Sequence, residues 1–308
     1  MNSKHVIAEA WHFTRENPRL MWVYAFLPAV LNTLVGVLYL GYQFFAFKRS
    51  PLFDNAEKSF MTEVITDVFG FLNMYSLWLP AIIATIVIGI MYLLLPTLCQ
   101  GALIQLIARK KRGENVRAIH GISFGLLVFL PLLEYHLLIK GFSLFSILTE
   151  AGFAWRNLGT DVMTTLLPVF IIAGVIGIIL TLLFTYSEFF IVLNKRSVLA
   201  AMGRSAKLVI ISWQHTFLIA ILMAIIGLRV IINILAVLLV PTLLFLSAGL
   251  VATFTLPNLG IIIGILISGT GLFVASYFTG ILNLFANAVW TLSYMELMDE
   301  KMTQEFIE

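Results

Sequence analysis

Apolar runs that are too long for the core of a soluble domain are the dominant feature of this 308-residue chain. One of them, residues 69–107, stays apolar well beyond the ~20 residues with which a helix crosses a bilayer. Charged residues make up only 11% of the chain, too few to cover a water-facing surface. The runs are continuous rather than alternating, which favours helices over a transmembrane β-barrel. We therefore expect an all-α, polytopic transmembrane helical bundle formed by a single membrane domain, residues 1–308.

The apolar runs predict six spans. We place them at residues 20–45, 69–107, 121–139, 163–193, 216–246 and 261–292. The second run is too short for two crossings and a turn, so we expect one long, tilted or kinked helix, with Pro80 and Pro96 as the kink points. A loop containing Ala154, Trp155 and Arg156 is expected between the third and fourth spans.

Two segments predict amphipathic helices that lie in the membrane interface. Between residues 185 and 215 a helical wheel separates an apolar face from a basic face. The apolar face carries Val198, Met202, Val209 and Trp213, and the basic face carries Arg196, Arg204 and Lys207. We expect the basic face to contact anionic lipid head groups. Residues 2–17 form the second such helix, and no cleavable secretory signal is expected there, because polar and acidic residues precede any apolar core.

Lysine and arginine are distributed unevenly between the two sides that six spans define. Thirteen of the 19 fall on the side that carries both termini and the loops 108–120 and 194–213, and four fall on the other side. Such a bias places the richer side in the cytoplasm. Both termini, including the acidic tail at residues 296–308, are therefore expected in the cytoplasm. The net charge of +3 does not indicate nucleic-acid binding, because the excess charge sits at the ends of spans.

Three stretches open alike, and they raise the alternative of an internal repeat. Val6-Ile7-Ala8, Val116-Arg117-Ala118 and Val198-Leu199-Ala200 each precede a pair of predicted spans. The chain would then contain three copies of helix, span and span, at residues 1–107, 108–195 and 196–297. Three matching residues leave this alternative open. An odd number of copies would argue against the two inverted halves of many secondary transporters.

The run Ala201, Ser205, Leu208 and Trp213, followed by an apolar span, resembles a segment of poorly characterised bacterial six-span inner-membrane families. These include the membrane domain fused to some glycerophosphodiester phosphodiesterases. The resemblance covers mainly residues 185–240, and it implies a bacterial cytoplasmic-membrane protein of the same broad architecture. It does not imply hydrolase activity, because no hydrolase domain accompanies the segment here.

Charged side chains within predicted spans are candidate functional residues, because a charge inside the bilayer is costly and usually has a partner. Glu134 and Arg229 each lie about 13 residues past the cytoplasmic start of their span, which places both about 20 Å deep. They can therefore form a pair. That pair is interpreted either as a salt bridge that locks two helices or as a switchable pair in a transport path.

Other polar residues of the spans have two interpretations. Glu188, Asn283 and Asn287 fall at similar depth in the fourth and sixth spans. They either line a pocket that opens to the cytoplasm or hydrogen-bond between helices. His136, which points to a different side of its helix from Glu134, is interpreted as hydrogen-bonded packing rather than a proton relay. Asn233 is a further polar residue, in the fifth span.

These observations favour a non-enzymatic inner-membrane protein that organises lipid, a ligand or a partner, with its basic helices on the anionic cytoplasmic leaflet. A transporter or channel that uses Glu134, Arg229 and the polar layer around Glu188 is the first alternative. A membrane-embedded enzyme acting on lipids is the second. No phosphate-binding glycine loop, HExxH motif or nucleophile elbow is present in the sequence, so no cofactor is expected. A protein partner or a homo-oligomer is left open.

Overall fold

The computed structural model describes residues 3–48, 66, 69–70, 72–74, 76–140, 142–229 and 257–305. All of the elements in these ranges are helical, which confirms the all-α prediction. Five helices are long and apolar enough to cross a membrane, or six if one bent pair of helices counts as a single span. The chain is thus a helical bundle with several membrane-spanning candidates. The predicted fifth span beyond Arg229, and Asn233 with it, lies outside the described residues.

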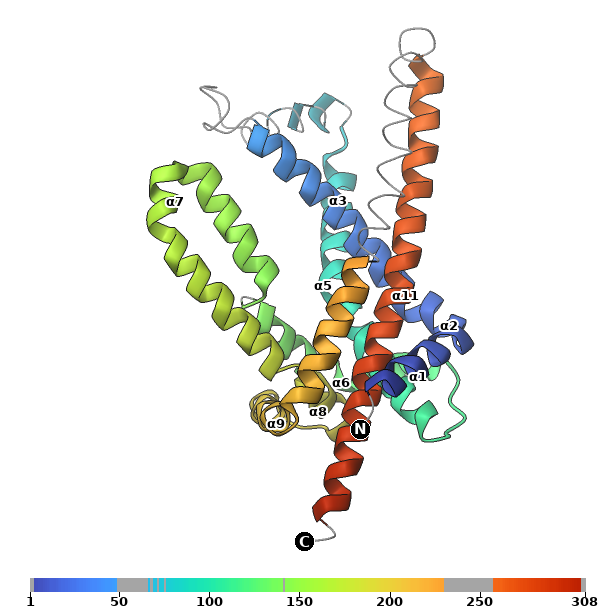
Figure 1. Ribbon diagram of the computed structural model, residues 1–308. Helices are drawn as coiled ribbons and strands as arrows, with labels where there is room; N and C mark the ends of the chain where they lie inside the picture. Colours follow the sequence, from blue (N-terminus) through green and yellow to red (C-terminus); the bar gives the residue numbers. More distant parts are fainter. Residues whose placement is uncertain are drawn as a thin grey trace.

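The helices follow one another along the chain as shown in Figure 1. They are α1 (Ser3–Glu16), α2 (Pro18–Leu20), the π-helical turn η1 (Met21–Phe26), α3 (Leu27–Lys48), α5 (Trp78–Lys111), α6 (His120–Lys140), α7 (Leu144–Leu183), α8 (Ser187–Asn194), α9 (Val198–Ile211), the Trp213–Arg229 helix and α11 (Pro257–Glu305). In Figure 1, α7 projects from one side of the bundle. The segments α1, α8 and α9 gather at the end of the bundle toward which the C-terminal part of α11 runs.

The first three predicted spans correspond to helices of the structure. The helix that runs from α2 through η1 into α3 covers the first, α5 the second and α6 the third. From Trp78 on, the second is one helix of 34 residues with Pro96 inside it, as predicted. It does not extend back to residue 69, because the chain turns at Ser76, where φ is 51°. Pro80 lies instead in the first turn of α5, where a missing N–H costs no hydrogen bond.

The fourth predicted span differs most from the structure. α7 already begins at Leu144, and its backbone breaks at Gly159, where φ is 81° and ψ is 176°. Glycine alone adopts this conformation readily. The two arms of α7 form a helical hairpin, and the second arm leads to α8 (Figure 1). The predicted loop around Trp155 is therefore wrong: the segment is helical, and both Ala154 and Arg156 are only 7% exposed.

α9 forms where the basic amphipathic helix is predicted, and the Trp213–Arg229 helix leaves it at an angle of 97°. The predicted apolar face is rotated relative to the observed one. The buried residues are Val198, Ala201, Ser205, Leu208 and Val209, whereas Trp213 is 57% exposed. This buried face packs on α8 and the neighbouring bundle helices. Arg196, Arg204 and Lys207 are exposed, as predicted.

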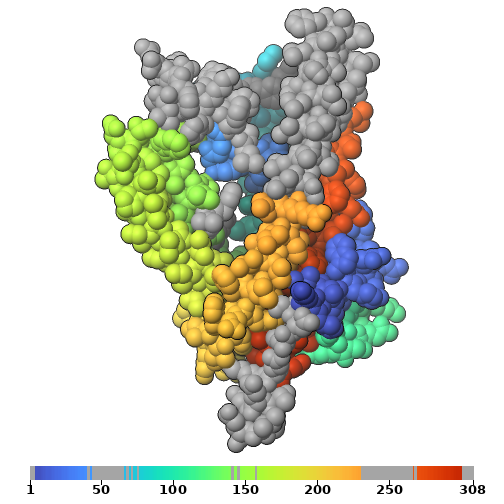
Figure 2. Space-filling model, in the orientation of Figure 1, coloured from blue at the N-terminus to red at the C-terminus, as the bar shows by residue number. Residues whose placement is uncertain are grey.

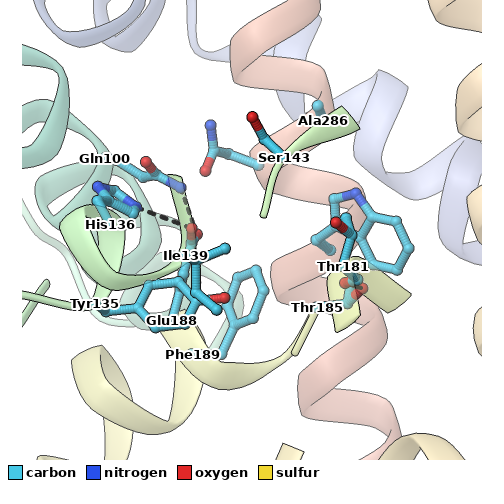
Figure 3. Close-up of a pocket in the computed structure, with 12 residues that line it drawn as sticks. Gln100, Tyr135, His136, Ile139, Ser143, Thr181, Thr185, Glu188, Phe189 and Ala286 are labelled. Carbon is cyan, nitrogen blue, oxygen red and sulfur yellow. Dashed lines mark hydrogen bonds and ion pairs between the residues drawn. The ribbon is translucent and has the colours of Figure 1, made fainter. Parts of the chain in front are cut away.

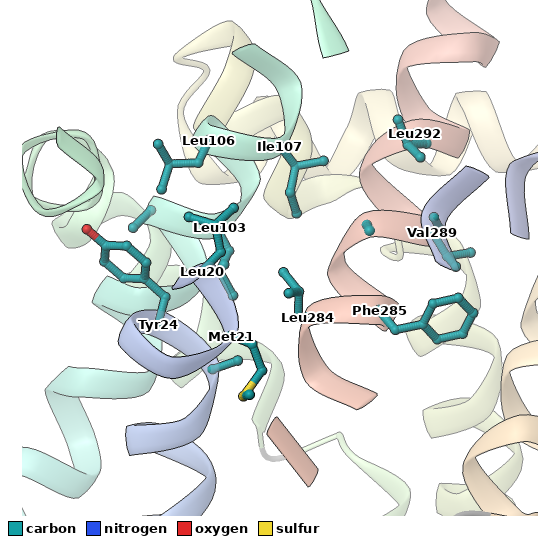
Figure 4. Packing of buried hydrophobic residues seen from close by; sticks show 14 of the residues in the cluster. Leu20, Met21, Tyr24, Leu103, Leu106, Ile107, Leu284, Phe285, Val289 and Leu292 are labelled. Atoms are coloured by element: carbon teal, nitrogen blue, oxygen red, sulfur yellow. The ribbon is translucent and has the colours of Figure 1, made fainter. Parts of the chain in front are cut away.

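Buried apolar residues form two clusters at the end of the bundle where α9 lies. The first joins α1, η1, α5 and α11 through residues such as Val6, Met21, Leu103 and Leu284 (Figure 4). The second joins α6, α8, α9 and the lower part of α11. Elsewhere apolar side chains are exposed along α5 and the second arm of α7, for example Leu79 at 69% and Val169 at 60%. Such continuous apolar surface suits contact with lipid.

Two further expectations concern the ends of segments. α11 has 49 residues and continues through the acidic segment to Glu305. The tail from residue 296 is predicted to be solvated. That prediction is wrong at its start, because Leu297 is only 5% exposed and is packed as part of α11. The stretch Val116–Ala118 lies in irregular backbone and a turn rather than in a helix. The middle copy of the predicted repeat therefore lacks its interfacial helix, and the repeat stays a prediction.

Candidate functional site

A cavity of about 560 Å³ lies between α5, α6, α7, α8 and α11 (Figure 3). Each of these five helices contributes a polar side chain, and two more flank α7. They are Gln100, His136, Thr181, Glu188 and Asn287, together with Ser143 and Thr185. Three aromatic residues, Tyr135, Phe189 and Trp290, complete much of the remaining wall. Within a bundle whose helices are mostly apolar, this is a concentration of polar groups around one space.

Glu188 is the centre of a hydrogen-bond network on one side of the cavity. Its Oε1 lies 2.9 Å from His136 Nε2, and its Oε2 accepts a hydrogen bond from Gln100 Nε2. The other ring nitrogen of His136, Nδ1, lies 3.2 Å from Thr97 Oγ1. Three helices therefore converge on one carboxylate: α5 through Gln100 and Thr97, α6 through His136, and α8 through Glu188 itself.

The local backbone explains why Glu188 reaches the cavity. The chain turns at residues 184–186 between α7 and α8, so α8 starts a new helix with Glu188 in its first turn. Ser205 of α9 fixes this break, because its buried Oγ accepts from Tyr186 N at 3.0 Å and donates to Leu183 O at 2.7 Å. The break is thus held from outside by α9.

The network has a consistent set of donors and acceptors when His136 is neutral. The Thr97 hydroxyl donates to Nδ1, and Nε2–H donates to Glu188; this tautomer is inferred from the partners. Glu188 then accepts two hydrogen bonds, and no lysine or arginine of the described residues forms an ion pair with it. The side chains of His136 and Glu188 are 26% and 20% exposed, so the charge is partly buried yet reachable from the cavity.

Two of the predicted pocket residues line this cavity, and one does not. Glu188 and Asn287 are in its wall, as predicted. Asn283 is not among the lining residues; its carbonyl oxygen accepts a 2.8 Å hydrogen bond from Asn287 Nδ2 within α11. His136 is hydrogen-bonded, as predicted, but to a carboxylate at the cavity rather than in ordinary packing.

The predicted pair of Glu134 and Arg229 does not form in the structure. Both residues are exposed, and no ion pair among the described residues joins them. The reason is rotation about the helix axis. Val128, Leu132 and Tyr135 form the buried face of α6, and at 100° per residue Glu134 points away from that face. Equal depth in the membrane was not a sufficient criterion for contact.

Gln100 and Thr97 were missed because they lie within the longest apolar run. Their only sequence signal is their spacing of three residues, which puts both on one side of a helix. A second network close to the cavity was missed as well. Tyr186 Oη lies 3.1 Å from Ser293 Oγ and accepts from Thr216 Oγ1 at 3.3 Å, and His215 Nε2 lies 3.2 Å from the same Ser293 Oγ.

The side chains around the cavity are suited to binding rather than to holding a metal. Within the described ranges, no group of three or more His, Cys, Asp or Glu residues is arranged to hold a metal ion. A lone carboxylate that faces aromatic rings can attract a cation or a hydrogen-bond donor. The adjacent histidine can also exchange a proton with it.

No protein-family model, no curated protein and no solved structure matches the chain. The resemblance of residues 185–240 to bacterial six-span families therefore stays a prediction. The functional information lies in the cavity and its side chains.

Proposed function

We propose that this is a non-enzymatic membrane protein that binds a cationic amphiphile in the cavity at Glu188. The observation that carries the proposal is a carboxylate, hydrogen-bonded to Gln100 and His136, in the wall of a cavity that also contains three aromatic residues. The volume of about 560 Å³ is within the range of small-molecule sites.

The charge and the rings act on the same ligand. Gln100 and His136 use one lone pair on each oxygen of Glu188, and further lone pairs remain for a ligand ammonium group. Tyr135, Phe189 and Trp290 supply aromatic faces around the same space, which attract a cation in a desolvated setting. The apolar part of the ligand would lie against side chains such as Ile139.

The hydroxyl groups at the cavity argue for binding over catalysis. Ser143 Oγ donates to Ser146 Oγ at 2.8 Å, and Thr185 Oγ1 donates to the Thr181 carbonyl oxygen at 2.9 Å. Neither is hydrogen-bonded to His136 or Glu188, so neither is paired with a base that would activate it as a nucleophile. Thr97, whose hydroxyl does bond with His136, is only 4% exposed and does not line the cavity.

The surroundings of this site follow from the charge distribution. We place the protein in a bacterial cytoplasmic membrane with both termini in the cytoplasm, supported by the excess of lysine and arginine on that side. Exposed Arg204 and Lys207 on α9, with Arg196 just before it, would then meet the anionic lipids of the inner leaflet. A protein partner or a second copy of the chain can share this surface.

Replacing Glu188 with glutamine tests the proposal. Purified protein in maltoside detergent is titrated with dodecylammonium, and binding is followed by the fluorescence of Trp290 and the other tryptophans. Loss of the charge should weaken binding about 10- to 100-fold, the usual range for a charged hydrogen bond. Glu134→Gln is the matched control, since it removes an exposed carboxylate from the opposite face of α6 and should leave the affinity unchanged.

Dodecanol, which has the same chain and no charge, should bind Glu188→Gln as well as it binds the unaltered protein. The proposal is wrong if dodecylammonium binds Glu188→Gln and Glu134→Gln with equal affinity. It is also wrong if the unaltered protein binds dodecylammonium no more tightly than dodecanol. Native mass spectrometry of the same samples shows any retained ligand and the number of subunits.

A carrier driven by protons is the second candidate, favoured by the position of His136 between Thr97 and Glu188. A proton added to His136 cancels the charge of the carboxylate, so proton and ligand cation compete for one site. In proteoliposomes, a proton gradient should then drive movement of a fluorescent lipophilic cation. His136→Gln should reduce the rate of this movement at least tenfold. If the cation binds but a proton gradient does not move it across the membrane, the carrier is ruled out and the binding protein is the better description.

A further inference from the structure

A second cavity lies at a different place in the fold and has the opposite charge. It has a volume of about 620 Å³ and is bounded by the start of α2, the end of α5 and the segment that leads into α6. Figure 2 shows the N-terminal segment, in blue, against the segment that follows α5, in green. Arg19, Lys110 and Arg117 line this cleft, with Glu16 as the one carboxylate among its lining residues.

Among the residues that the structure describes, none of the three cations of the cleft forms an ion pair, whereas two of their neighbours do. Arg109 pairs with Glu114 at 3.2 Å, and Lys111 pairs with Glu9 of α1. Lys110, between them, donates to the neutral amide oxygen of Asn17 instead.

Glu16 lies 3.2 Å from His12 and supplies one negative charge against the three positive charges of the cleft, so the lining keeps an excess of positive charge. Within the described residues, no ion pair involves Arg19 or Arg117. Three positive charges around one space repel one another, and an anion between them would remove that repulsion.

The walls of the cleft are fixed by buried contacts. Tyr24, which is 2% exposed, donates from its hydroxyl to the Ala118 carbonyl oxygen at 2.6 Å. This bond ties the segment before α6 to η1. Leu20, at the inner end of the cleft, is 1% exposed. The backbone beside Arg19 and Arg117 is therefore held by the packed core, while both arginine side chains are exposed.

Exposed apolar side chains adjoin the cleft. Ile119 lines it and is 70% exposed, and Trp22 and Val23, on the turn of helix that follows Leu20, are 44% and 47% exposed. We propose that the cleft binds the phosphate group of an anionic phospholipid, whose acyl chains lie along these side chains. The same chemistry would accept a soluble phosphate monoester, and only the acyl contacts separate the two. This site is independent of the cavity at Glu188.

The test compares two double variants that change the charge equally. Arg19→Gln with Arg117→Gln removes two cations from the cleft. Arg196→Gln with Lys207→Gln removes two exposed cations elsewhere, one just before α9 and one on it. Binding of phosphatidylglycerol and of phosphatidylcholine with the same chains is measured in detergent at 0.5 M NaCl, where attraction between exposed charges is largely screened. The cleft variant should bind phosphatidylglycerol at least about 10-fold more weakly, as expected when a charge-assisted hydrogen bond to the phosphate is lost, and the variant of Arg196 and Lys207 should bind it as the unaltered protein does.

Glycerol phosphate, added alone, distinguishes the two sources of phosphate. If it binds as tightly as the lipid, and the cleft variant loses both, the site is one for soluble phosphate compounds. Equal losses in the two double variants would overturn the proposal, as would a lack of preference for phosphatidylglycerol over phosphatidylcholine in the unaltered protein. The only cysteine of the chain, Cys99, is 4% exposed, so its slow reaction with a thiol dye shows that each variant is folded.

Discussion

Replacing Gly125 with leucine is expected to abolish the packing of α5 against α6 and to destabilise the protein by at least about 3 kcal/mol, the upper range for overpacking a core. A Cβ atom at this position would lie 2.5 Å from the Leu98 carbonyl oxygen and 3.3 Å from Ala102 Cβ. Backbone atoms cannot rotate away as a side chain can, so the two helices must separate. Because Gln100 and His136 hold Glu188 from these two helices, ligand binding should be lost as well.

Gly89→Leu is the matched control for this substitution. Gly89 lies in α5, the helix against which Gly125 of α6 packs, but no atom is within 4 Å of the position that its Cβ would take. Its replacement should leave both stability and binding unchanged. The temperature at which a thiol dye labels buried Cys99 measures the midpoint of unfolding for both variants. If the midpoint is the same for Gly125→Leu and Gly89→Leu, the close approach of α5 and α6 is not as the structure shows.

Replacing Tyr186 with alanine should cost about 4 kcal/mol of stability, as for other large aromatic residues in a core. The side chain is fully buried, at 0% exposure, and its ring contacts Phe189, Trp290 and Tyr294. Alanine would leave a cavity where α8, α11 and the Trp213–Arg229 helix meet. The expected result is a large fall in the unfolding midpoint measured on Cys99.

Tyr186→Phe separates the packing of this ring from its hydrogen bonds. The ring stays, but the hydroxyl that bonds with Ser293 and Thr216 is removed. A lost buried hydrogen bond costs about 1–3 kcal/mol, so phenylalanine should have the smaller effect. Equal losses for the two variants would mean that the hydrogen bonds, rather than the packed ring, hold these helices together.

The sequence predicts the helices of this fold better than their directions. Continuous apolar residues identify α3, α5 and α6 because any helix that spans a bilayer needs about 20 of them. The first arm of α7 contains Glu150, Arg156 and Asn157, so a pattern based on hydrophobicity treats it as a loop. Its helical hairpin depends on one residue, Gly159, with a positive φ. Local composition does not reveal a reversal of this kind.

For the candidate site, the sequence predicts the depth of a residue in the membrane but not the direction in which its side chain points. Glu188 and Asn287 were found because residues at one depth in neighbouring spans can meet, and they do line one cavity. The same reasoning failed for Glu134 and Arg229, which are exposed, because it ignored which way each helix faces. The facing of a helix follows from tertiary packing. Gln100, a single amide in a long apolar run, acquires its role only through contact with Glu188.

The length of α11 has a mechanical consequence. Its 49 residues, at 1.5 Å per residue, make a rod about 74 Å long, whereas a bilayer with its head groups is about 40–45 Å thick. Even at a tilt of about 40°, the upper end of the usual range, part of the rod stands clear of the lipid. Asn287 and Trp290 at the cavity lie on this rod. A force applied to the protruding end of α11 would therefore move the helix as a lever and shift one wall of the cavity. Contacts made outside the membrane could in this way change the volume of the cavity.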